Sequence, residues 1–261
     1  MATKMSTEKT DQEADSVQPI EQAKPDRTPV LDRLVRFCHF NLNYDKEVRD
    51  YLTEKRRLTN QTIVKFQLGA FPSLAKLARH FTEYELLFIG AAKRDEDTGN
   101  LVSKFNTNRL IMPIYDVHGR PVAISGRVLC NEEDRIKLGA PKYDNTVYSK
   151  TSCLYGLNLA KSTIRAKGAA LVVEGQFDVI SAVQAGTENV VGSSGAFFSM
   201  RQQALLARYC HRIYLGLDQD EAGIEGTRRV MKRPPVDGVL IREKKVPAGF
   251  KDWDEYFYSK M

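Results

Sequence analysis

The sequence predicts an α/β protein in which a mixed α+β amino-terminal part precedes a mainly parallel β-sheet. Three observations lead to this prediction. From about residue 166, short aliphatic runs alternate with helical stretches, which is the pattern of βαβ units. Residues 28–90 place apolar side chains at intervals of three and four, as amphipathic helices do. Between these regions, residues 108–129 alternate apolar and polar side chains around a turn.

Residues 1–30 are expected to form a disordered tail, because they are polar, rich in charge and poor in aliphatic side chains. They contain no apolar stretch of the kind that a secretory signal needs. The chain has 261 residues and a net charge of +6, and it lacks any run of eighteen apolar residues. We therefore expect a cytoplasmic protein with no membrane partner.

The helical stretch has plausible start and stop signals. Thr59, Ser73 and Thr82 are expected to cap helices at their amino ends, and Gly69 is expected to end the helix that Thr59 begins. Residues 108–129 predict a β-hairpin whose turn contains "HGR". The sequence "GAPKYDNTVYSKTSCLYGL" that follows is rich in turn formers and basic residues, and we expect an ordered loop there.

Acidic residues follow the strands of the predicted parallel sheet. Glu174 ends the strand "AALVV", Asp218 and Asp220 follow the strand "IYLGL", and Asp252 and Asp254 come after the last strand. Because ligands of parallel sheets bind at the carboxyl ends of the strands, we expect these five carboxylates to meet at one edge. Their mutual repulsion would be relieved by a divalent cation, and oxygen ligands favour Mg²⁺ or Mn²⁺. The alternative is that they are solvated strand ends.

Glycines near these acids indicate close approach of the backbone. Gly175 follows Glu174 directly, Gly192 and Gly195 lie in "VVGSSGAF", and Gly223 follows Asp220 in the next helix. The alternative for each glycine is a simple turn. Gly175 is the one that we include among the expected site residues.

Basic residues precede the predicted sheet. Residues 91–165 carry twelve basic and eight acidic side chains, which suits a polyanionic partner but also fits a solvated surface of mixed charge. Arg127 ends a hairpin strand, and Lys142, Tyr143 and Asn145 lie in the following loop. A base beside an aromatic ring and an amide can bind a backbone phosphate and an exposed nucleobase. Each residue alone is more often an ordinary surface side chain, but as a group beside the acids they favour function.

The four cysteines predict neither a zinc ribbon nor a redox motif, because no CxxC pair is present. Cys38 and His39 are adjacent and could be two metal ligands, but a partly buried helical pair is the better interpretation. We expect no zinc in this chain and reduced thiols.

At these residues the sequence resembles the Toprim domain, and more narrowly the bacterial DnaG-type DNA primases. The resemblance is carried by "LVVEGQFDVISAVQAG", "VVGSSGAF", "LGLDQDEAGIEGTRR" and "VPAGFKDWDEY". Upstream, "YLTEKRRLTNQTIVKFQLG", "NRLIMPIYDVHGRPVAISGRVL" and "PKYDNTVYSKTSCLYGL" resemble the amino-terminal part of that family's RNA polymerase core. After the tail (1–30) expected from composition, the resemblance implies a primase amino-terminal core (31–165) and a Rossmann-like Toprim subdomain (166–261).

The resemblance implies synthesis of short RNA primers on single-stranded DNA from ribonucleoside triphosphates, by two-metal nucleotidyl transfer. Glu174, Asp218 and Asp220 match the central metal-binding acids, which are also the expected catalytic residues. Asp252 and Asp254 match a later acidic pair. The matches to basic positions that contact template and triphosphate are Arg109, Arg127, Lys142 and Lys150.

The sequence also departs from the family. We expect neither a zinc-binding domain before the core nor a helicase-binding domain after it, and Gln176 and Phe177 stand where the family more often has an aromatic residue and a methionine. We therefore expect a replicative helicase and a separate zinc-binding protein as partners, or a reduced primase of a phage or mobile element. The alternatives are a Toprim nuclease, which would activate water with the same acids, and an inert DNA-binding replication subunit.

Overall fold

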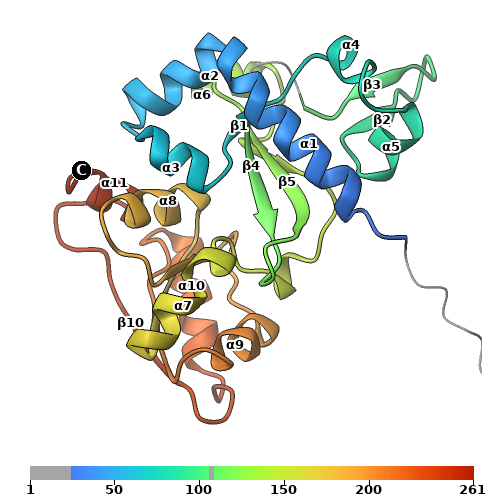
Figure 1. Cartoon of the computed structure of the whole chain (residues 1–261). Coiled ribbons are helices and arrows are strands. Elements are labelled where there is room, and N and C mark those ends of the chain that lie inside the picture. The colour runs from blue at the N-terminus through green and yellow to red at the C-terminus, as the bar shows by residue number, and fades with distance from the viewer. Residues whose placement is uncertain (1–24, 106–108) are drawn as a thin grey trace, which may run out of the picture.

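The computed structural model describes residues 25–105 and 109–261, so most of the predicted tail at residues 1–30 lies outside the described residues. Figure 1 shows an upper lobe, in which helices surround an antiparallel sheet, and a lower lobe formed by the carboxy-terminal half of the chain. Both lobes mix helices with strands, and the predicted α/β class is confirmed. None of the helices described has the length and apolar character that a membrane crossing requires.

The upper lobe is built on a four-stranded sheet of order β1-β4-β5-β6 with antiparallel pairs. Its strands, and the separate β2–β3 hairpin, are β1 (Gly69–Ala70), β2 (Ala92–Arg94), β3 (Leu101–Ser103), β4 (Leu110–Tyr115), β5 (Pro121–Arg127) and β6 (Tyr143–Asn145). Its helical elements are α1 (Thr28–Asn41), η1 (Leu42–Tyr44), α2 (Lys46–Asp50), η2 (Tyr51–Lys55), α3 (Asn60–Lys65), α4 (Leu74–Leu77), α5 (Glu83–Phe88) and α6 (Glu132–Lys137).

The lower lobe is built on a parallel sheet of order β10-β9-β7-β8. Its strands are β7 (Ala169–Val173), β8 (Val190–Gly192), β9 (Arg212–Leu215) and β10 (Leu240–Glu243). Its helical elements are η3 (Lys150–Ser152), α7 (Leu157–Lys167), α8 (Gln176–Gln184), α9 (Met200–Ala207), α10 (Glu221–Met231) and α11 (Trp253–Tyr258). The predicted alternation of strand and helix is therefore confirmed.

Alternation along β7 explains how the parallel sheet is covered on both faces. Leu171 and Val173 pack in the cluster that contains apolar residues of α8 and α11, whereas Ala170 and Val172 pack with α7, α9 and α10. The first cluster also contains Met112 and other residues of β4, so one continuous core joins the two lobes. A third cluster packs α1 against the opposite face of β4 and β5. Burial on both faces explains why β7 is aliphatic throughout.

Three of the predicted helix caps are confirmed. The side chains of Thr59, Ser73 and Thr82 each accept a hydrogen bond from a backbone N–H of the first turn of α3, α4 and α5. The prediction that Gly69 ends α3 is wrong, because α3 ends at Lys65 and Gly69 belongs to β1. A Cβ at Gly69 would lie 2.5 Å from the Cys38 carbonyl carbon, so this glycine permits close packing of β1 against α1.

The predicted hairpin is confirmed as β4 and β5, with an antiparallel register that pairs Met112 with Ser125. The ordered loop predicted after it contains a further strand, β6, whose Tyr143 pairs with Arg127 of β5. Cys38 lies in the core on α1, and the Nδ1 atom of His39 is hydrogen-bonded to the Leu68 carbonyl, so the interpretation as a helical pair is confirmed.

Candidate active site

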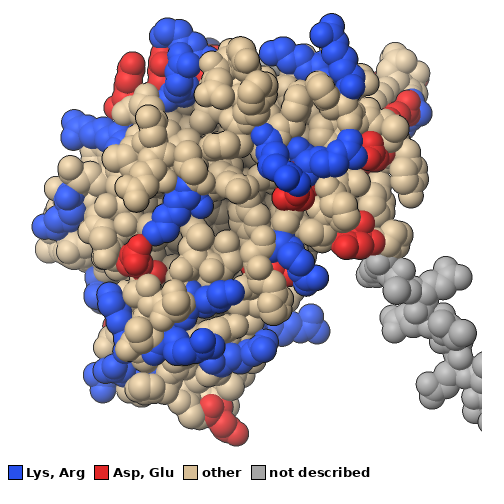
Figure 2. Space-filling view, viewed as in Figure 1, with Lys and Arg blue, Asp and Glu red and all other residues tan. Residues whose placement is uncertain are grey.

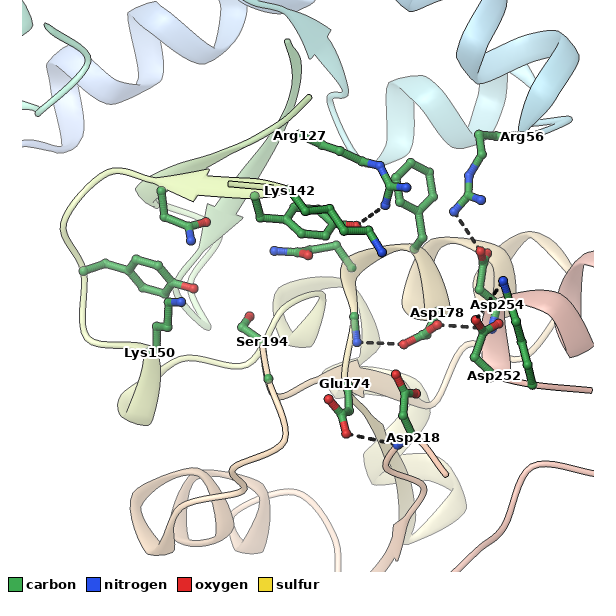
Figure 3. A pocket seen from close by; sticks show the side chains of 18 residues that line it. Arg56, Arg127, Lys142, Lys150, Glu174, Asp178, Ser194, Asp218, Asp252 and Asp254 are labelled. Atoms are coloured by element: carbon green, nitrogen blue, oxygen red, sulfur yellow. Dashed lines mark hydrogen bonds and ion pairs between the residues drawn. The ribbon is translucent and has the colours of Figure 1, made fainter. Parts of the chain in front are cut away.

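Two of the predicted acids meet directly at the carboxyl edge of the parallel sheet. Glu174 follows β7, and Asp218 follows the neighbouring strand β9. The backbone N–H of Asp218 donates to Glu174 Oε1 at 3.0 Å. This hydrogen bond holds the two strand ends side by side, so the structure brings Glu174 and Asp218 together, as predicted (Figure 3).

Gly223 on α10 explains why the acids can stand so close to a helix. A Cβ on Gly223 would lie 2.1 Å from the Asp218 carbonyl oxygen and 2.8 Å from Glu174 Oε1. Any side chain there would force the strand ends apart. The N–H of Gly223 donates to Asp220 Oδ1 at 2.9 Å, so Asp220 caps α10. Asp220 is exposed at the amino end of α10 and is not among the residues that line the cavity described below.

Asp178, near the start of α8, ties the carboxy-terminal acids to this edge. Its two carboxylate oxygens accept hydrogen bonds from the backbone N–H groups of Gly175, at 2.7 Å, and Asp254, at 3.1 Å. The side chain is 6% exposed. Through this bridge the start of α11, with Asp252 as its cap and Asp254 in its first turn, comes to lie beside Glu174 and Asp218 (Figure 3).

The carboxylate of Asp254 is already engaged on both oxygens. Arg56 Nη2 lies 2.8 Å from Oδ2, and the hydroxyl of Ser181 donates to Oδ1. Asp252 caps α11 by accepting from the N–H of Glu255, and its other oxygen lies 3.6 Å from Lys251 Nζ. The sequence predicted the place of this acidic pair but not the cations that accompany it.

Burial and mutual repulsion shift the titration of the acids. Burial first, and then the charges of Asp218 and Asp220, raise the pKa of Glu174 to about 7. Burial, and then Asp218, Asp254 and Asp252, raise the pKa of Asp178 to about 7 against the effect of its hydrogen bond from Gly175. Burial, and then the charges of Asp252 and Asp220, raise the pKa of Asp218, which the charges of Lys142 and Lys251 partly oppose.

One atom in this group fits the ligand of a metal ion. Asp218 Oδ1 is buried and has no hydrogen-bond partner among the described residues. An unpaired buried carboxylate oxygen is costly unless a cation or proton satisfies it. No three His, Cys, Asp or Glu side chains within residues 25–105 and 109–261 already stand in a coordinating arrangement. A cation would therefore have to draw the acids together, against the repulsion that now separates them.

A cavity of about 400 Å³ lies between these acids and the upper lobe. Its upper wall comes from η2, β5, β6 and the segment before η3, and its floor comes from the edge of the parallel sheet. Its lining residues are Arg56, Arg127, Lys142, Tyr143, Asn145, Tyr148, Lys150, Glu174, Gly175, Gln176, Phe177, Asp178, Ser194, Gly195, Asp218, Lys251, Asp252 and Asp254. Ten of the twelve predicted site residues are in this set.

The upper wall is cationic and faces the acids across the cavity. Figure 3 shows Arg127, Lys142 and Arg56 above Glu174, Asp178 and Asp218, with Lys150 and Ser194 at one end. Basic side chains also spread over both lobes of the face shown in Figure 2, with acidic ones among them, so charge alone does not mark the site.

The structure does not bring Arg109 to the cavity. Arg109 is 2% exposed and its Nη1 donates to the Gly126 carbonyl at 3.0 Å. The side chain supports β5 from within the upper lobe. Its role as a direct contact to template or triphosphate therefore stays a prediction from the resemblance alone.

The end of the cavity near Lys150 is held by a glutamine of the lower lobe. Gln202 on α9 is fully buried, and its Nε2 donates to the carbonyls of Lys150, Cys153 and Ser193 at 3.0, 2.8 and 3.2 Å. Tyr155 and Gly192 add an isolated antiparallel bridge. The segment that carries Lys150 is thereby attached to the parallel sheet.

Several lining residues were not predicted. Asp178 had a signal, because an acid three residues after Gly175 is placed to cap the helix that begins there. Arg56 had none, because it lies in the basic run "EKRR" of a helical stretch, and only the fold brings it to Asp254 across 198 residues.

Comparison with known proteins identifies the two parts of the chain separately. Residues 37–161 match the family model "DNA primase catalytic core, N-terminal domain", and residues 171–257 match the Toprim-like model. The DNA primase of Synechococcus elongatus is 36% identical over 222 residues, which are 79% of this chain and 31% of that protein. The chain spans about a third of the length of the curated relatives it matches.

Solved structures agree with these matches over most of the fold. The Aquifex aeolicus primase, with its zinc-binding and RNA polymerase domains, aligns with 89% of this chain and 57% of its own at a TM-score of 0.77 and 28% identity. A DnaG primase catalytic domain bound to single-stranded DNA aligns with 89% of this chain and 76% of its own at a TM-score of 0.76 and 28% identity. With both family models matched in order on one such core, the chain belongs to the DnaG-type DNA primases.

Proposed function

We propose that this chain synthesises short RNA primers on single-stranded DNA from ribonucleoside triphosphates. The observation that carries the proposal is the cavity itself, in which a buried, unpaired Asp218 oxygen beside Glu174 faces Arg127 and Lys142. Acids that fit a divalent cation, set opposite cations that fit phosphate, suit phosphoryl transfer. The chain's relatives are named DNA primase, and one solved relative is bound to single-stranded DNA.

Glu174, Asp218 and Asp220 are the residues that would hold Mg²⁺ or Mn²⁺. Asp252 and Asp254 are candidates for a second cation. Asp252 is the better placed of the two, because its Oδ2 has only a 3.6 Å contact with Lys251, whereas both Asp254 oxygens have partners at hydrogen-bond distance. Bound divalent cations of this kind activate a hydroxyl as nucleophile and neutralise the charge of a triphosphate.

The residues of the chain contribute by position and charge. Arg127, Lys142 and Lys150 stand where phosphates of the nucleotide or template would pass, and Tyr143 and Asn145 lie between them on β6. Asn145 Oδ1 is buried without a hydrogen-bond partner among the described residues, so it is available to a base or sugar donor. Holding two substrates in register in this way accounts for a large part of the rate of such reactions.

Asp218→Asn tests the proposal. The substitution keeps the shape and removes the charge, so we expect primer synthesis to fall by at least about 100-fold, since a lost metal ligand removes several kcal/mol of transition-state stabilisation. The melting temperature should not fall, because the repulsion with Glu174 is relieved. Asp237→Asn, in an exposed turn at the opposite edge of the sheet, is the matched control.

The assay uses single-stranded DNA, Mg²⁺ or Mn²⁺ and labelled ribonucleotides, with the chain alone and with a replicative helicase or a zinc-binding protein from the same source. Elongating labelled product supports a primase. Cut template without product supports a Toprim nuclease. DNA binding without metal-dependent activity under every condition, or full activity of Asp218→Asn, would overturn the assignment.

A further inference from the structure

Two guanidinium groups on the upper wall of the cavity share one aromatic ring. Phe177, the second residue of α8, is 3% exposed and lines the cavity. The Cζ atom of Arg56 lies 3.7 Å from the centre of the Phe177 ring, and that of Arg127 lies 5.0 Å from it. Both distances are within the range of a cation–π interaction, and the contact with Arg56 is a close one.

Only one of the two arginines has a carboxylate within ion-pair distance among the described residues. Arg56 is paired with Asp254. Arg127 donates to the neutral hydroxyl of Tyr143, and no carboxylate of the described residues lies within ion-pair distance of it. Figure 3 shows both guanidinium groups on the wall above Asp178 and Asp254. A half-buried cation without a carboxylate is costly unless an anion or an aromatic face stabilises it.

The ring is held at a fixed position between the lobes. Gln176, the preceding residue, is buried, and its Nε2 donates to the Ser125 hydroxyl at 3.3 Å. Ser125 lies two residues before Arg127 on β5, so this hydrogen bond sets the distance between α8 and the strand that carries Arg127. Tyr51 completes the arrangement, because its ring meets the Phe177 ring edge-on at 6.3 Å.

We infer that Phe177 is a positioning residue that presents Arg127 and Arg56 to a phosphate group of the substrate. The negative face of the ring holds two like charges near each other, while Asp254 neutralises one of them. Arg127 then keeps its remaining donors for an oxyanion that crosses the cavity toward Glu174 and Asp218. This inference rests on the proposed function for the identity of the substrate, but the binding of phosphate can be measured without it.

The competing explanation is that Phe177 only fills space in the core, where it packs with Val179 and Ile180. The two explanations differ in what the ring must supply. Packing needs its volume, and positioning needs its negative face. Pentafluorophenylalanine keeps the shape of the ring and removes the electrostatic attraction for a cation, so it separates the two.

The experiment replaces Phe177 with pentafluorophenylalanine and, separately, makes Phe177→Leu. For each we measure kcat and KM for ATP and GTP in primer synthesis, and the dissociation constant of a dye-labelled single-stranded oligonucleotide without divalent cation. We expect one of the two affinities to weaken about five- to tenfold with either change, because a desolvated cation–π contact is lost. The melting temperature should change little for the fluorinated protein, and kcat should stay within about twofold.

The change in KM and the change in oligonucleotide affinity together show whether the phosphate belongs to the nucleotide or to the template. A higher KM for nucleotides assigns the arginines to the triphosphate, and weaker oligonucleotide binding assigns them to the template. Tyr209→Leu is the matched control, because it removes a ring at 5.2 Å from Arg165 away from the cavity. Unchanged KM and oligonucleotide affinity in the fluorinated protein would overturn the inference. A wild-type chain that makes no primer refutes the proposed function, while the oligonucleotide arm still tests Phe177.

Discussion

The floor and the upper wall of the cavity carry opposite charges, and they hold those charges in different ways. On the floor, Glu174 and Asp178 are fixed by backbone N–H groups, and burial raises the pKa of each to about 7. On the wall, Arg127 is held by aromatic rings and a phenol. The carboxylates of the floor repel one another, whereas the charge of Arg127 on the wall is stabilised without an ion pair.

This difference indicates what each side needs from outside the chain. Carboxylates that repel one another are stabilised by a divalent cation. Arg127, which rests on rings and not on a carboxylate, would bind phosphate without first releasing a carboxylate partner, so less interaction energy would be lost on binding. Variants that change the floor or the wall alone separate these two requirements.

The largest effect is expected from Gly223→Ala, which attacks the floor through the backbone. The added Cβ would meet the Asp218 carbonyl oxygen at 2.1 Å, so the strand end must move away from Glu174. A displacement of about 1 Å at a reacting centre costs on the order of 100-fold in rate. Primer synthesis should fall by about that factor. Ile224→Ala, on the next and exposed position of α10, is the control, and equal activity of the two variants would contradict the account.

A smaller effect is expected from Arg127→Ala, which attacks the wall. A charge-assisted hydrogen bond is worth about 1.5–3 kcal/mol, so affinity for nucleotide or template should weaken by roughly 10- to 100-fold. Steady-state kinetics and oligonucleotide binding measure the two affinities. Arg165→Ala, which also removes an arginine beside a ring, should leave both unchanged. If Arg127→Ala behaves like this control, the wall does not contact phosphate.

The smallest effect is a pH dependence of the floor. A carboxyl group whose pKa is raised by folding binds its proton more tightly in the folded than in the unfolded chain. Its contribution to stability is therefore fully present below about pH 4.5 and is lost as the pH rises toward 7, the raised pKa of Glu174. Over this interval, in the presence of EDTA, Glu174→Gln should become more stable than the wild type. We expect a gain of about 1 kcal/mol in the free energy of unfolding after solvent screening, which corresponds to about 2–4 °C in melting temperature.

Adding Mg²⁺ or Mn²⁺ at pH 7.5 should narrow that difference, because a bound cation stabilises the ionised wild-type acid and not the amide. Calorimetry or thermal circular dichroism of the two proteins from pH 4.5 to 7.5 provides the measurement. A difference that does not vary with pH would mean that Glu174 titrates as an ordinary exposed acid.

Local sequence patterns predicted the sheet and its acids because the signals are short in range. β7 is five aliphatic residues followed directly by Glu174, and a parallel sheet then places the ends of neighbouring strands together. The caps at Thr59, Ser73 and Thr82 are equally local. By contrast, the prediction that Gly69 ends a helix is wrong, because a glycine after a helical stretch can either end that helix or allow another helix to pack closely.

The parts of the site that the sequence did not predict depend on contacts between distant segments. Arg56 reaches the cavity only because η2 packs beside α8, and Arg109 is turned inward although it lies one residue before β4. The short strand β6 lies among turn-forming residues, so the sequence predicted a loop there. Its pairing with β5 places Tyr143 beside Arg127. Charge at a position is visible in a sequence, but the direction in which the side chain points is set by tertiary packing.

The three hydrogen bonds of the Gln202 amide bear on how substrates enter. Lys150 stands at the mouth of the cavity, yet its carbonyl and that of Cys153 are held by an amide rooted in the lower lobe. Moving the segment that carries Lys150 away from the parallel sheet would leave these two carbonyls without their donor in a partly buried place. We therefore expect the Lys150 end of the cavity to keep its width when a ligand binds, so that a ligand enters along the cavity and is not enclosed by movement of this segment.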